Sequence, residues 1–558
     1  RFQKKEARKK RAQEQPEHTF ASPEAAYAFY AAASGTRLRL LVSTLLCLGS
    51  VLLLVPSTPL ITGAFSDHAA VFSAAMLGLL LLQAVCSYDV CLSGVIALLR
   101  FRFDQYSMLF LALCAVVADA FFAVAEGRTP FCTVAGILLL LALWGRDLLY
   151  DARRRSLRAI SNMDEPVAAI REEKAWHGYD CIFRAPGDAE QFAVQLEMPD
   201  AGSRIMRVWA PVMTAVTLAL SVLTSLRTGE HFLWAWSAML LASFPAGILI
   251  AYAKPFSALA RRLYRAGAAI AGWQGARILS GEAGLIVEDA DLFPPQNVTQ
   301  GGMKLYGSRP APMVIGYANA VVQTAGSGLV PLFEQMMHDQ NGRRYTVDTF
   351  RRYEGGGLGA TIRGDVVLMG SIAFMKLMRV RVPEGTRLKQ AVYLSVNGEL
   401  TAVFALNYAP AESVRAGLSA VLRAGSLVPV LATRDFMITP QFLKLRYKIP
   451  PEHIEFPIVE ERARLSSQEI PRTGPQGALM ARSSFASFAG SVVSARTLRG
   501  AAIIAMIVAL AGSVLGTALM FFLTFLGSSF SASCWNLFLY TVLWLIPGLL
   551  TALLAGRA

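Results

Sequence analysis

Long apolar segments alternate with polar segments along the chain, and this pattern predicts a protein that crosses a membrane several times. Eight apolar runs approach the length of a helix that spans a bilayer. We predict membrane helices at residues 40–62, 70–99, 105–126, 130–148, 207–227, 231–253, 500–526 and 534–555. Polar segments at 149–206 and 254–497 interrupt the series. The expected order is therefore four helices, a small insert, two helices, a large insert and two helices.

Clusters of arginine and lysine lie at alternate ends of the predicted helices, and such clusters mark the cytoplasmic side of a membrane. They include Arg100 with Arg102, Arg153 to Arg158, and Lys254 to Arg265. We therefore expect both termini and both inserts in the cytoplasm. The first apolar run begins near Arg39 and has no small-residue cleavage site close behind it, so we expect no cleavable signal peptide there.

The composition agrees with a membrane protein and excludes an ordinary soluble domain. Of the 558 residues, 54% are hydrophobic and only 16% are charged. The net charge of +14 lies mostly beside the apolar runs, which indicates contact with the lipid bilayer rather than with nucleic acid. The basic tail at 1–39 admits two interpretations, a disordered cytoplasmic segment or a segment that binds anionic lipid head groups. Seven cysteines without a Cys-x-x-Cys pair argue against a disulfide framework and against a soluble zinc module.

The large insert contains a short apolar stretch that is followed at once by acidic residues. Leu285–Val287 reads as a buried strand, and Asp289 and Asp291 come next in the chain. Phe293 and the Pro294-Pro295 pair then end any strand pairing, because proline has no N–H to donate. We therefore expect a strand that ends in a loop with two aspartates, Asp289 and Asp291.

The order of helices and inserts resembles that of the heavy-metal-transporting P-type ATPases. The resemblance implies a polytopic α-helical membrane protein whose first insert, 149–206, is a reduced actuator-like segment. It implies an α/β, Rossmann-like (HAD-type) phosphorylation domain, or P-domain, at 254–310 and 384–497. An α+β insert similar to the nucleotide-binding N-domain would interrupt it at 311–383. The other segments are the tail at 1–39 and the membrane helices at 40–148, 207–253 and 498–558.

A glycine run in the large insert extends the resemblance. Residues 355–364 read Gly-Gly-Gly-Leu-Gly-Ala-Thr-Ile-Arg-Gly and are similar to a glycine motif of the family. Gly355, Gly357 and Gly359 are the candidate nucleotide-binding positions, because glycine lets a backbone approach a flat ring or a phosphate closely. Farther along, two alternating segments at 391–406 flank an Asn-Gly turn and predict a β-hairpin, which the resemblance assigns to the P-domain. A helix at 412–423 and a strand at 428–431 follow.

The charged positions that the family uses for phosphoryl transfer are replaced in this sequence. Aligning Val298–Gly301 with the family's Leu-Thr-x-Gly puts Phe293 at the position of the phosphorylated aspartate, and a phenyl ring is no nucleophile. A shifted alignment offers Asp289 or Asp291, but neither precedes Lys-Thr-Gly. Other family motifs are changed in the same way, with Ala432-Thr433-Arg434 for Thr-Gly-Asp, Asn407 for an aspartate and Val330-Pro331 for His-Pro. The magnesium-binding Gly-Asp-Gly-x-Asn-Asp loop has no counterpart, and the first insert lacks Thr-Gly-Glu.

The predicted membrane helices offer few groups that bind cations. The sixth keeps only the proline of the family's Cys-Pro-Cys, as Phe244-Pro245-Ala246, and this proline still interrupts a helix. The seventh and eighth have no ionisable residue in their apolar cores and offer only Met506, Met520, Asn536 and Tyr540. Asp89 with Cys86 and Cys91 is the strongest intramembrane group, and Asp119 is a second carboxylate. Because the two cysteines do not share a helix face, we favour a buried hydrogen bond or an interfacial position for Asp89 over a metal site.

The resemblance and the changed motifs together predict a catalytically inactive, P-type-ATPase-like protein in a bacterial plasma membrane. Its role would be that of a scaffold for another membrane protein, or of a regulator that senses a cytoplasmic ligand. The alternative is an ATP-driven heavy-metal cation pump with a rebuilt catalytic site, and a passive transporter is a third class. We expect no metal and no cofactor, and any ATP binding at the glycine run would be weak and free of magnesium.

Overall fold

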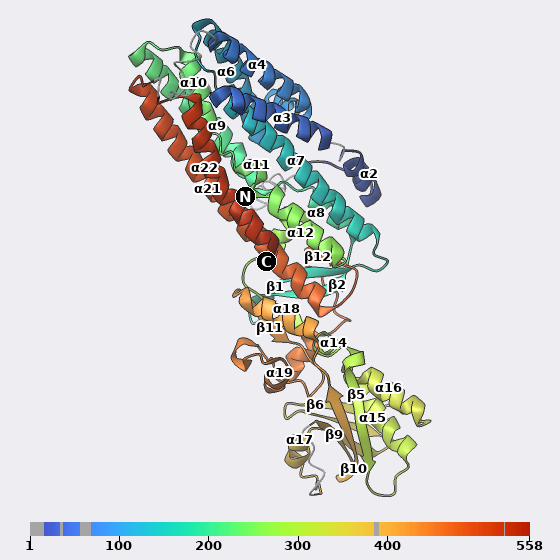
Figure 1. Cartoon of the computed structure of the whole chain (residues 1–558). Coiled ribbons are helices and arrows are strands. Elements are labelled where there is room, and N and C mark those ends of the chain that lie inside the picture. The colour runs from blue at the N-terminus through green and yellow to red at the C-terminus, as the bar shows by residue number, and fades with distance from the viewer. Residues whose placement is uncertain (1–15, 34–36, 56–68, 384–389, 529–530, 558) are drawn as a thin grey trace, which may run out of the picture.

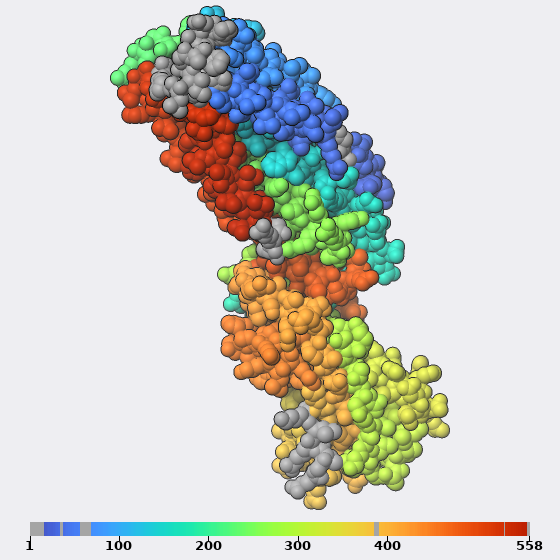
Figure 2. Space-filling model, in the orientation of Figure 1, coloured from blue at the N-terminus to red at the C-terminus, as the bar shows by residue number. Residues whose placement is uncertain are grey.

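The computed structural model describes residues 16–33, 37–55, 69–383, 390–528 and 531–557. Figure 1 shows an elongated molecule with a bundle of long helices at one end and two α/β lobes below it. The first lobe is built around strands β1–β4, β11 and β12, and the second around β5–β10. The first lobe adjoins the bundle, and the second lies beyond it at the far end (Figure 2).

The helix bundle has the character of a multi-pass membrane protein. Among the described residues, seven helical stretches are long and apolar enough to cross a membrane. The helices concerned are α3 (Arg37–Leu54), α4 (Ala69–Cys86), α6 (Gln105–Glu126), α7 (Cys132–Ser161), α9 (Ala201–Thr228), α21 (Phe485–Phe525) and α22 (Cys534–Arg557). Seven of the eight predicted spans are therefore confirmed, although the last residues of the first one, 56–62, lie outside the described residues.

Two of the predicted helices are interrupted: the break at Pro245 was predicted, whereas the break inside the span at 70–99 was not. The one at 231–253 divides into α10 (Phe232–Ala242) and α11 (Ile248–Ala251), each too short to cross a membrane alone. Pro245 lies in the gap and lacks the N–H that a continuous helix needs. The helix at 70–99 divides at Ser87 into α4 and α5 (Tyr88–Leu99).

Helix α21 connects the bundle to the first lobe. Its 41 residues correspond to about 60 Å of helix, roughly twice the hydrocarbon thickness of a bilayer. The first turns therefore lie outside the membrane, where Phe488 and Val492 join the same core as Leu418 of α18 (Glu412–Arg423). Helix α12 (Ala253–Arg265) runs from the bundle toward the same lobe (Figure 1).

The first lobe contains a six-stranded sheet in the order β11-β4-β2-β1-β12-β3. Its strands are β1 (Val167–Trp176), β2 (Tyr179–Pro186), β3 (Ala268–Ile270), β4 (Ala283–Val287), β11 (Leu427–Leu431) and β12 (Gln476–Met480). β4 is parallel to β11 and also to β2, and β1 is antiparallel to β12. The small insert that was predicted as an actuator-like segment thus supplies two strands of this sheet instead of a sheet of its own. The reason is burial, since an isolated two-stranded hairpin is marginal in water.

The second lobe contains an antiparallel sheet in the order β5-β10-β9-β8-β7-β6. Its strands are β5 (Val298–Leu305), β6 (Thr349–Tyr353), β7 (Gly357–Ile362), β8 (Asp365–Gly370), β9 (Ala391–Val396) and β10 (Glu399–Tyr408). The β9–β10 hairpin, predicted as part of the P-domain, belongs instead to this sheet, because β9 pairs with β8 from Val367↔Val396 to Gly370↔Tyr393. The predicted division at 384 therefore falls inside the lobe, which extends from Val298 to Tyr408.

The remaining helices cover the lobes and connect them to the bundle. They are α2 (Pro23–Ala33), α8 (Ala189–Leu196), α13 (Gly272–Ile278), α14 (Asp289–Leu292), α15 (Ala311–Ala325), α16 (Val330–Asp339), α17 (Ile372–Leu377), α19 (Pro440–Tyr447) and α20 (Val459–Leu465), with short 3-10 turns at Pro295–Asn297 and Pro451–His453.

Candidate functional site

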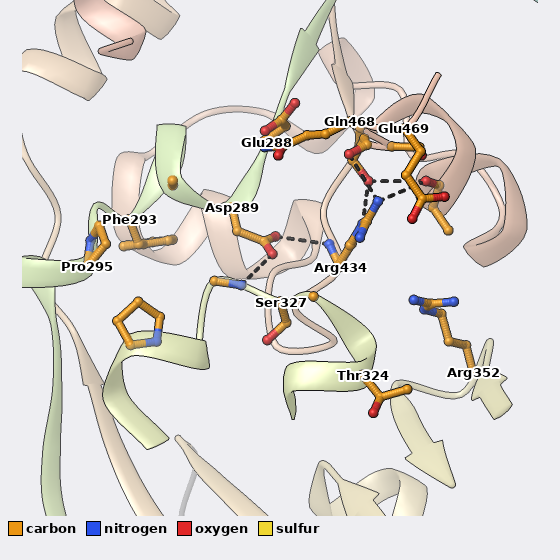
Figure 3. Close-up of a pocket in the computed structure, with 18 residues that line it drawn as sticks. Glu288, Asp289, Phe293, Pro295, Thr324, Ser327, Arg352, Arg434, Gln468 and Glu469 are labelled. Atoms are coloured by element: carbon orange, nitrogen blue, oxygen red, sulfur yellow. Dashed lines mark hydrogen bonds between the residues drawn. The ribbon is translucent and has the colours of Figure 1, made fainter. Parts of the chain in front are cut away.

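A cavity of about 720 Å³ lies between the two lobes, at the carboxyl ends of the parallel strands β4 and β11. Open α/β sheets generally bind ligands at this edge. The first lobe contributes the segments after β4 and β11 and the end of α20, and the second contributes β6 and the α15–α16 loop. Figure 3 shows the lining side chains converging from both lobes.

Asp289 is the carboxylate at the end of β4, and backbone N–H groups from both lobes bind it. Its Oδ2 accepts from Gly328 N of the α15–α16 loop at 2.8 Å. Its Oδ1 accepts from Arg434 N at 3.0 Å and from Asp435 N at 3.3 Å, both in the segment after β11. Burial and the nearby carboxylate of Asp435 raise the pKa of Asp289 to about 7. The side chain therefore ties three chain segments together.

Asp435 lies behind Asp289 and is also buried. Its Oδ2 accepts from the Tyr408 hydroxyl at 2.7 Å, and its Oδ1 accepts from Met437 N at 2.9 Å. Burial raises the pKa of Asp435 to about 6. Two neighbouring buried carboxylates disfavour double ionisation, since each charge opposes the other.

Phe293 lies six residues after Val287, the last residue of β4, and it is 2% exposed. Its ring contacts three other rings, with centroid distances of 5.2 Å to Tyr408, 5.7 Å to Phe442 and 5.4 Å to Tyr447. The sequence alignment put Phe293 at the phosphorylated position, whereas the structure puts Asp289 nearest the strand end. Phe293 lines one side of the cavity (Figure 3), while its ring packs in an aromatic cluster with the three other rings.

Asp291, the second aspartate in this loop, faces the small insert. Its side chain accepts from Glu288 N at 2.8 Å and pairs with Arg184 of β2, at 2.7 Å between Nη2 and Oδ2. Burial raises its pKa to about 6, although Arg184 opposes the shift. Asp291 thus connects the loop after β4 to the insert and does not line the cavity.

Two arginines that the sequence analysis did not single out as ligand groups line the cavity. Arg434 Nε donates to Ser466 Oγ at 2.8 Å, and its Nη2 donates to the carbonyls of Ser466 at 3.0 Å and Ala463 at 3.2 Å. Arg352, on β6, donates from Nη2 to Ala325 O at 3.1 Å. No sequence motif marks Arg352, because its position depends on how the second lobe docks on the first.

The candidate glycines contact side chains of the same lobe. A Cβ on Gly357 would lie 2.2 Å from Phe374 Cδ1, and one on Gly359 would lie 2.9 Å from Tyr353 Cε2. A Cβ on Gly355 would lie 2.8 Å from Leu377 Cδ2. Gly357 therefore makes room for the Phe374 ring of the chain itself, whereas Gly359 and Gly355 lie against Tyr353 and Leu377.

The two intramembrane carboxylates, Asp89 and Asp119, each form ion pairs with arginine side chains of the chain itself. Asp89 forms ion pairs with Arg39 and, at 3.6 Å, with Arg146. Asp119 is paired with Arg128, which donates from Nη1 to Oδ2 at 3.0 Å. Within the described part of the chain, no group of three or more His, Cys, Asp or Glu is placed to hold a metal.

Hydrogen bonds from the neighbouring helices α21 and α22 stabilise the region of the break at Pro245. Ser513 of α21 donates its hydroxyl to Ser243 O. Tyr540 of α22 donates to Gly512 O at 2.7 Å. Tyr540 therefore fixes α22 to α21, and Ser513 satisfies a carbonyl that the broken helix leaves without a helical partner.

The sequence has no significant match to a protein-family model or to a curated protein. In structure, the chain is similar to a zinc-transporting PIB-type ATPase, with 14% identity, 94% of this chain and 100% of that chain covered, and a TM-score of 0.48. It is also similar to a second structure of a zinc-transporting PIB-type ATPase, in another state, with 14% identity, 90% of this chain and 99% of that chain covered, and a TM-score of 0.43. At these values the likeness concerns overall architecture and does not bear on activity.

Proposed function

We propose that this chain is a catalytically inactive, P-type-ATPase-like membrane protein that acts as a scaffold, a partner-binding protein or a regulator. It would lie in a bacterial plasma membrane, with both termini and both lobes in the cytoplasm. The observation that carries the proposal is the hydrogen bonding of Asp289, whose carboxylate holds three backbone N–H groups from two lobes.

A carboxylate that accepts a phosphoryl group needs to be ionised, to present a free oxygen and to have a cation nearby. Asp289 is 8% exposed, and both of its oxygens are engaged. Burial and the neighbouring carboxylate of Asp435 raise its pKa and so disfavour the ionised form. Among the described residues that line the cavity there is no lysine, and the guanidinium groups of Arg434 and Arg352 donate to Ser466 and to backbone carbonyls, not to Asp289.

The two strands of the small insert are part of the sheet of the first lobe, and this arrangement supports the same proposal. Strand β2 is paired with β4 at Ile182↔Leu285, and β1 is paired with β12. The ion pair of Arg184 with Asp291 adds a buried contact between the insert and the loop after β4. Any cycle that moved the insert relative to this loop would have to break the strand pairing and the ion pair.

A second candidate is an ATP-driven cation pump with a rebuilt site. The specific observation in its favour is the position of Asp289 at the end of a strand that is parallel to both neighbours. In that case Asp289 itself would be the nucleophile, and Gly328 would have to move away from Oδ2.

Phosphorylation of the purified, full-length protein distinguishes the two candidates. We expect no acid-stable, hydroxylamine-sensitive label after incubation with radiolabelled ATP and magnesium. A labelled band that disappears in Asp289→Asn but persists in Glu469→Gln, an exposed carboxylate of the same cavity, would establish the pump and overturn the proposal.

A further inference from the structure

The cavity between the lobes has two cationic side chains without an acidic partner. Arg434 donates only to a hydroxyl and to carbonyl oxygens, and Arg352 makes its hydrogen bond to a carbonyl. Neither forms an ion pair with a described residue. Both are half-buried and line the cavity. Burial and the nearby positive charge of Arg434 lower the pKa of Arg352, so an anion placed beside the two would be stabilised.

Two of the three carboxylates that line the cavity, Glu288 and Asp289, have other partners. Glu288 lies 3.6 Å from Arg184, on the side of the small insert. The oxygens of Asp289 accept backbone N–H groups. Glu469 is exposed and forms no ion pair with a described residue, although Figure 3 shows it on the same wall as Arg434. The guanidinium groups are therefore not neutralised by these carboxylates.

The two arginines belong to different lobes. Arg352 extends from β6 of the second lobe, and Arg434 follows β11 of the first. Hydroxyl groups of Thr324 and Ser327, from the second lobe, and of Ser467, from the first, line the space with them. Such groups hydrogen-bond anionic oxygens, and the planar guanidinium groups suit phosphate and carboxylate in particular.

We propose that this cavity binds a small organic dianion, a phosphate ester or a polycarboxylate, between Arg352 and Arg434 and without a magnesium ion. The volume of about 720 Å³ suits a ligand of the size of a sugar phosphate. Because the two arginines come from different lobes, the bound anion would hold the lobes together. The inference names a ligand class for the regulatory role proposed above and rests on that role.

Calorimetric titration of the full-length protein, in nanodiscs of uncharged lipid and with EDTA present, tests the inference. The probes are inorganic phosphate, glucose 6-phosphate, citrate and ATP. We expect glucose 6-phosphate or citrate to bind. The one that binds more tightly shows whether the site prefers a phosphate ester or a polycarboxylate. The affinity should fall tenfold or more in Arg352→Gln, because a charge-assisted contact is lost. Arg352→Lys, which retains the charge, should recover part of it.

Arg351→Gln is the matched control. Arg351 is the exposed neighbour of Arg352 on β6, and successive strand residues face opposite sides of a sheet. Absence of binding by all four probes at millimolar concentration overturns the inference. Equal losses in Arg351→Gln and Arg352→Gln, or binding of ATP alone and only after magnesium is added, also overturn it. Each of these results leaves the phosphorylation test unchanged, so failure of the anion site and failure of the proposed function remain distinguishable.

Discussion

The guanidinium of Arg184 and the carboxylate of Asp291 form a buried ion pair, with 2.7 Å between Nη2 and Oδ2. Arg184 lies on β2 of the small insert, and Asp291 lies in the loop after β4 of the large insert, separated by more than a hundred residues. Their side chains are only 11% and 1% exposed. The pair therefore fixes two distant parts of the sequence beside the candidate site.

Removal of one partner of this pair should destabilise the first lobe strongly. Arg184→Ala leaves the Asp291 carboxylate buried without its counter-charge, which costs on the order of 3–5 kcal/mol. We expect a clearly lower midpoint of thermal unfolding for the purified protein in detergent, followed by tryptophan fluorescence. The double variant Arg184→Met with Asp291→Leu removes both charges and should recover most of the loss. An Arg184→Ala protein as stable as the wild type would show that the pair is not buried in solution.

The stability of the protein should fall as the pH rises from about 4 to about 7. The pKa of Asp289 is raised from its ordinary 3.8 to about 7, so the folded state binds more protons than the unfolded state within this window. The contribution is fully present below the unfolded pKa and is lost as the pH rises through the folded pKa. Unfolding midpoints measured from pH 5 to pH 8 should decline less steeply in Asp289→Asn.

Substitution of Phe293 by aspartate should damage the fold without creating a phosphorylated enzyme. The ring is buried against three aromatic residues, and its loss alone costs roughly 3–5 kcal/mol. A carboxylate there would also be buried beside apolar rings. We expect a lower unfolding midpoint for Phe293→Asp, a smaller decrease for Phe293→Leu and no hydroxylamine-sensitive label in either. A labelled band in Phe293→Asp would mean that the catalytic machinery is otherwise intact.

A methyl group at Gly357 should destabilise the second lobe. The added Cβ would lie 2.2 Å from the Phe374 ring, and overpacking of this kind costs about 1–3 kcal/mol. The loss should appear as a lower unfolding midpoint in Gly357→Ala and be partly reversed by Phe374→Leu. Gly490→Ala is the matched control, because its Cβ meets no atom within 4 Å. If Gly357→Ala leaves stability unchanged but abolishes ATP binding, the glycine serves a nucleotide and not Phe374.

The orientation of the chain is testable with reporter fusions. Insertions after Gly127, Thr228 and Ser528 lie between membrane helices at the end remote from both lobes and should give an external signal. Insertions at the turns formed by Gly178 and Gly398, one in each lobe, should give a cytoplasmic signal. An external signal from either lobe would contradict the topology that the basic clusters predict.

Local elements of the structure were determined by the sequence. The β9–β10 turn is an example, because Asn397 and Gly398 adopt φ values of 53° and 83°, the conformation that an Asn-Gly hairpin favours. The strand at Leu285–Val287 was also predicted correctly, as was the interruption at Pro245. In each case the decisive interaction lies within a few residues, either in the backbone preference of a residue or in a missing N–H. Long apolar runs are equally local; they predicted eight spanning helices, and the described residues contain seven helical stretches long and apolar enough to span a membrane.

Only the tertiary structure decided which strands share a sheet and which side chains meet. The β1–β2 hairpin joined β4 and β12, and the β9–β10 hairpin joined the second lobe, since strand partners are selected by long-range burial and not by local pattern. Asp289 was one of two candidate aspartates in the loop after β4, and it became the site residue because Gly328 and Arg434 donate to it from distant segments. Arg352 and Arg434 face the same cavity for the same reason: their proximity depends on how the two lobes pack.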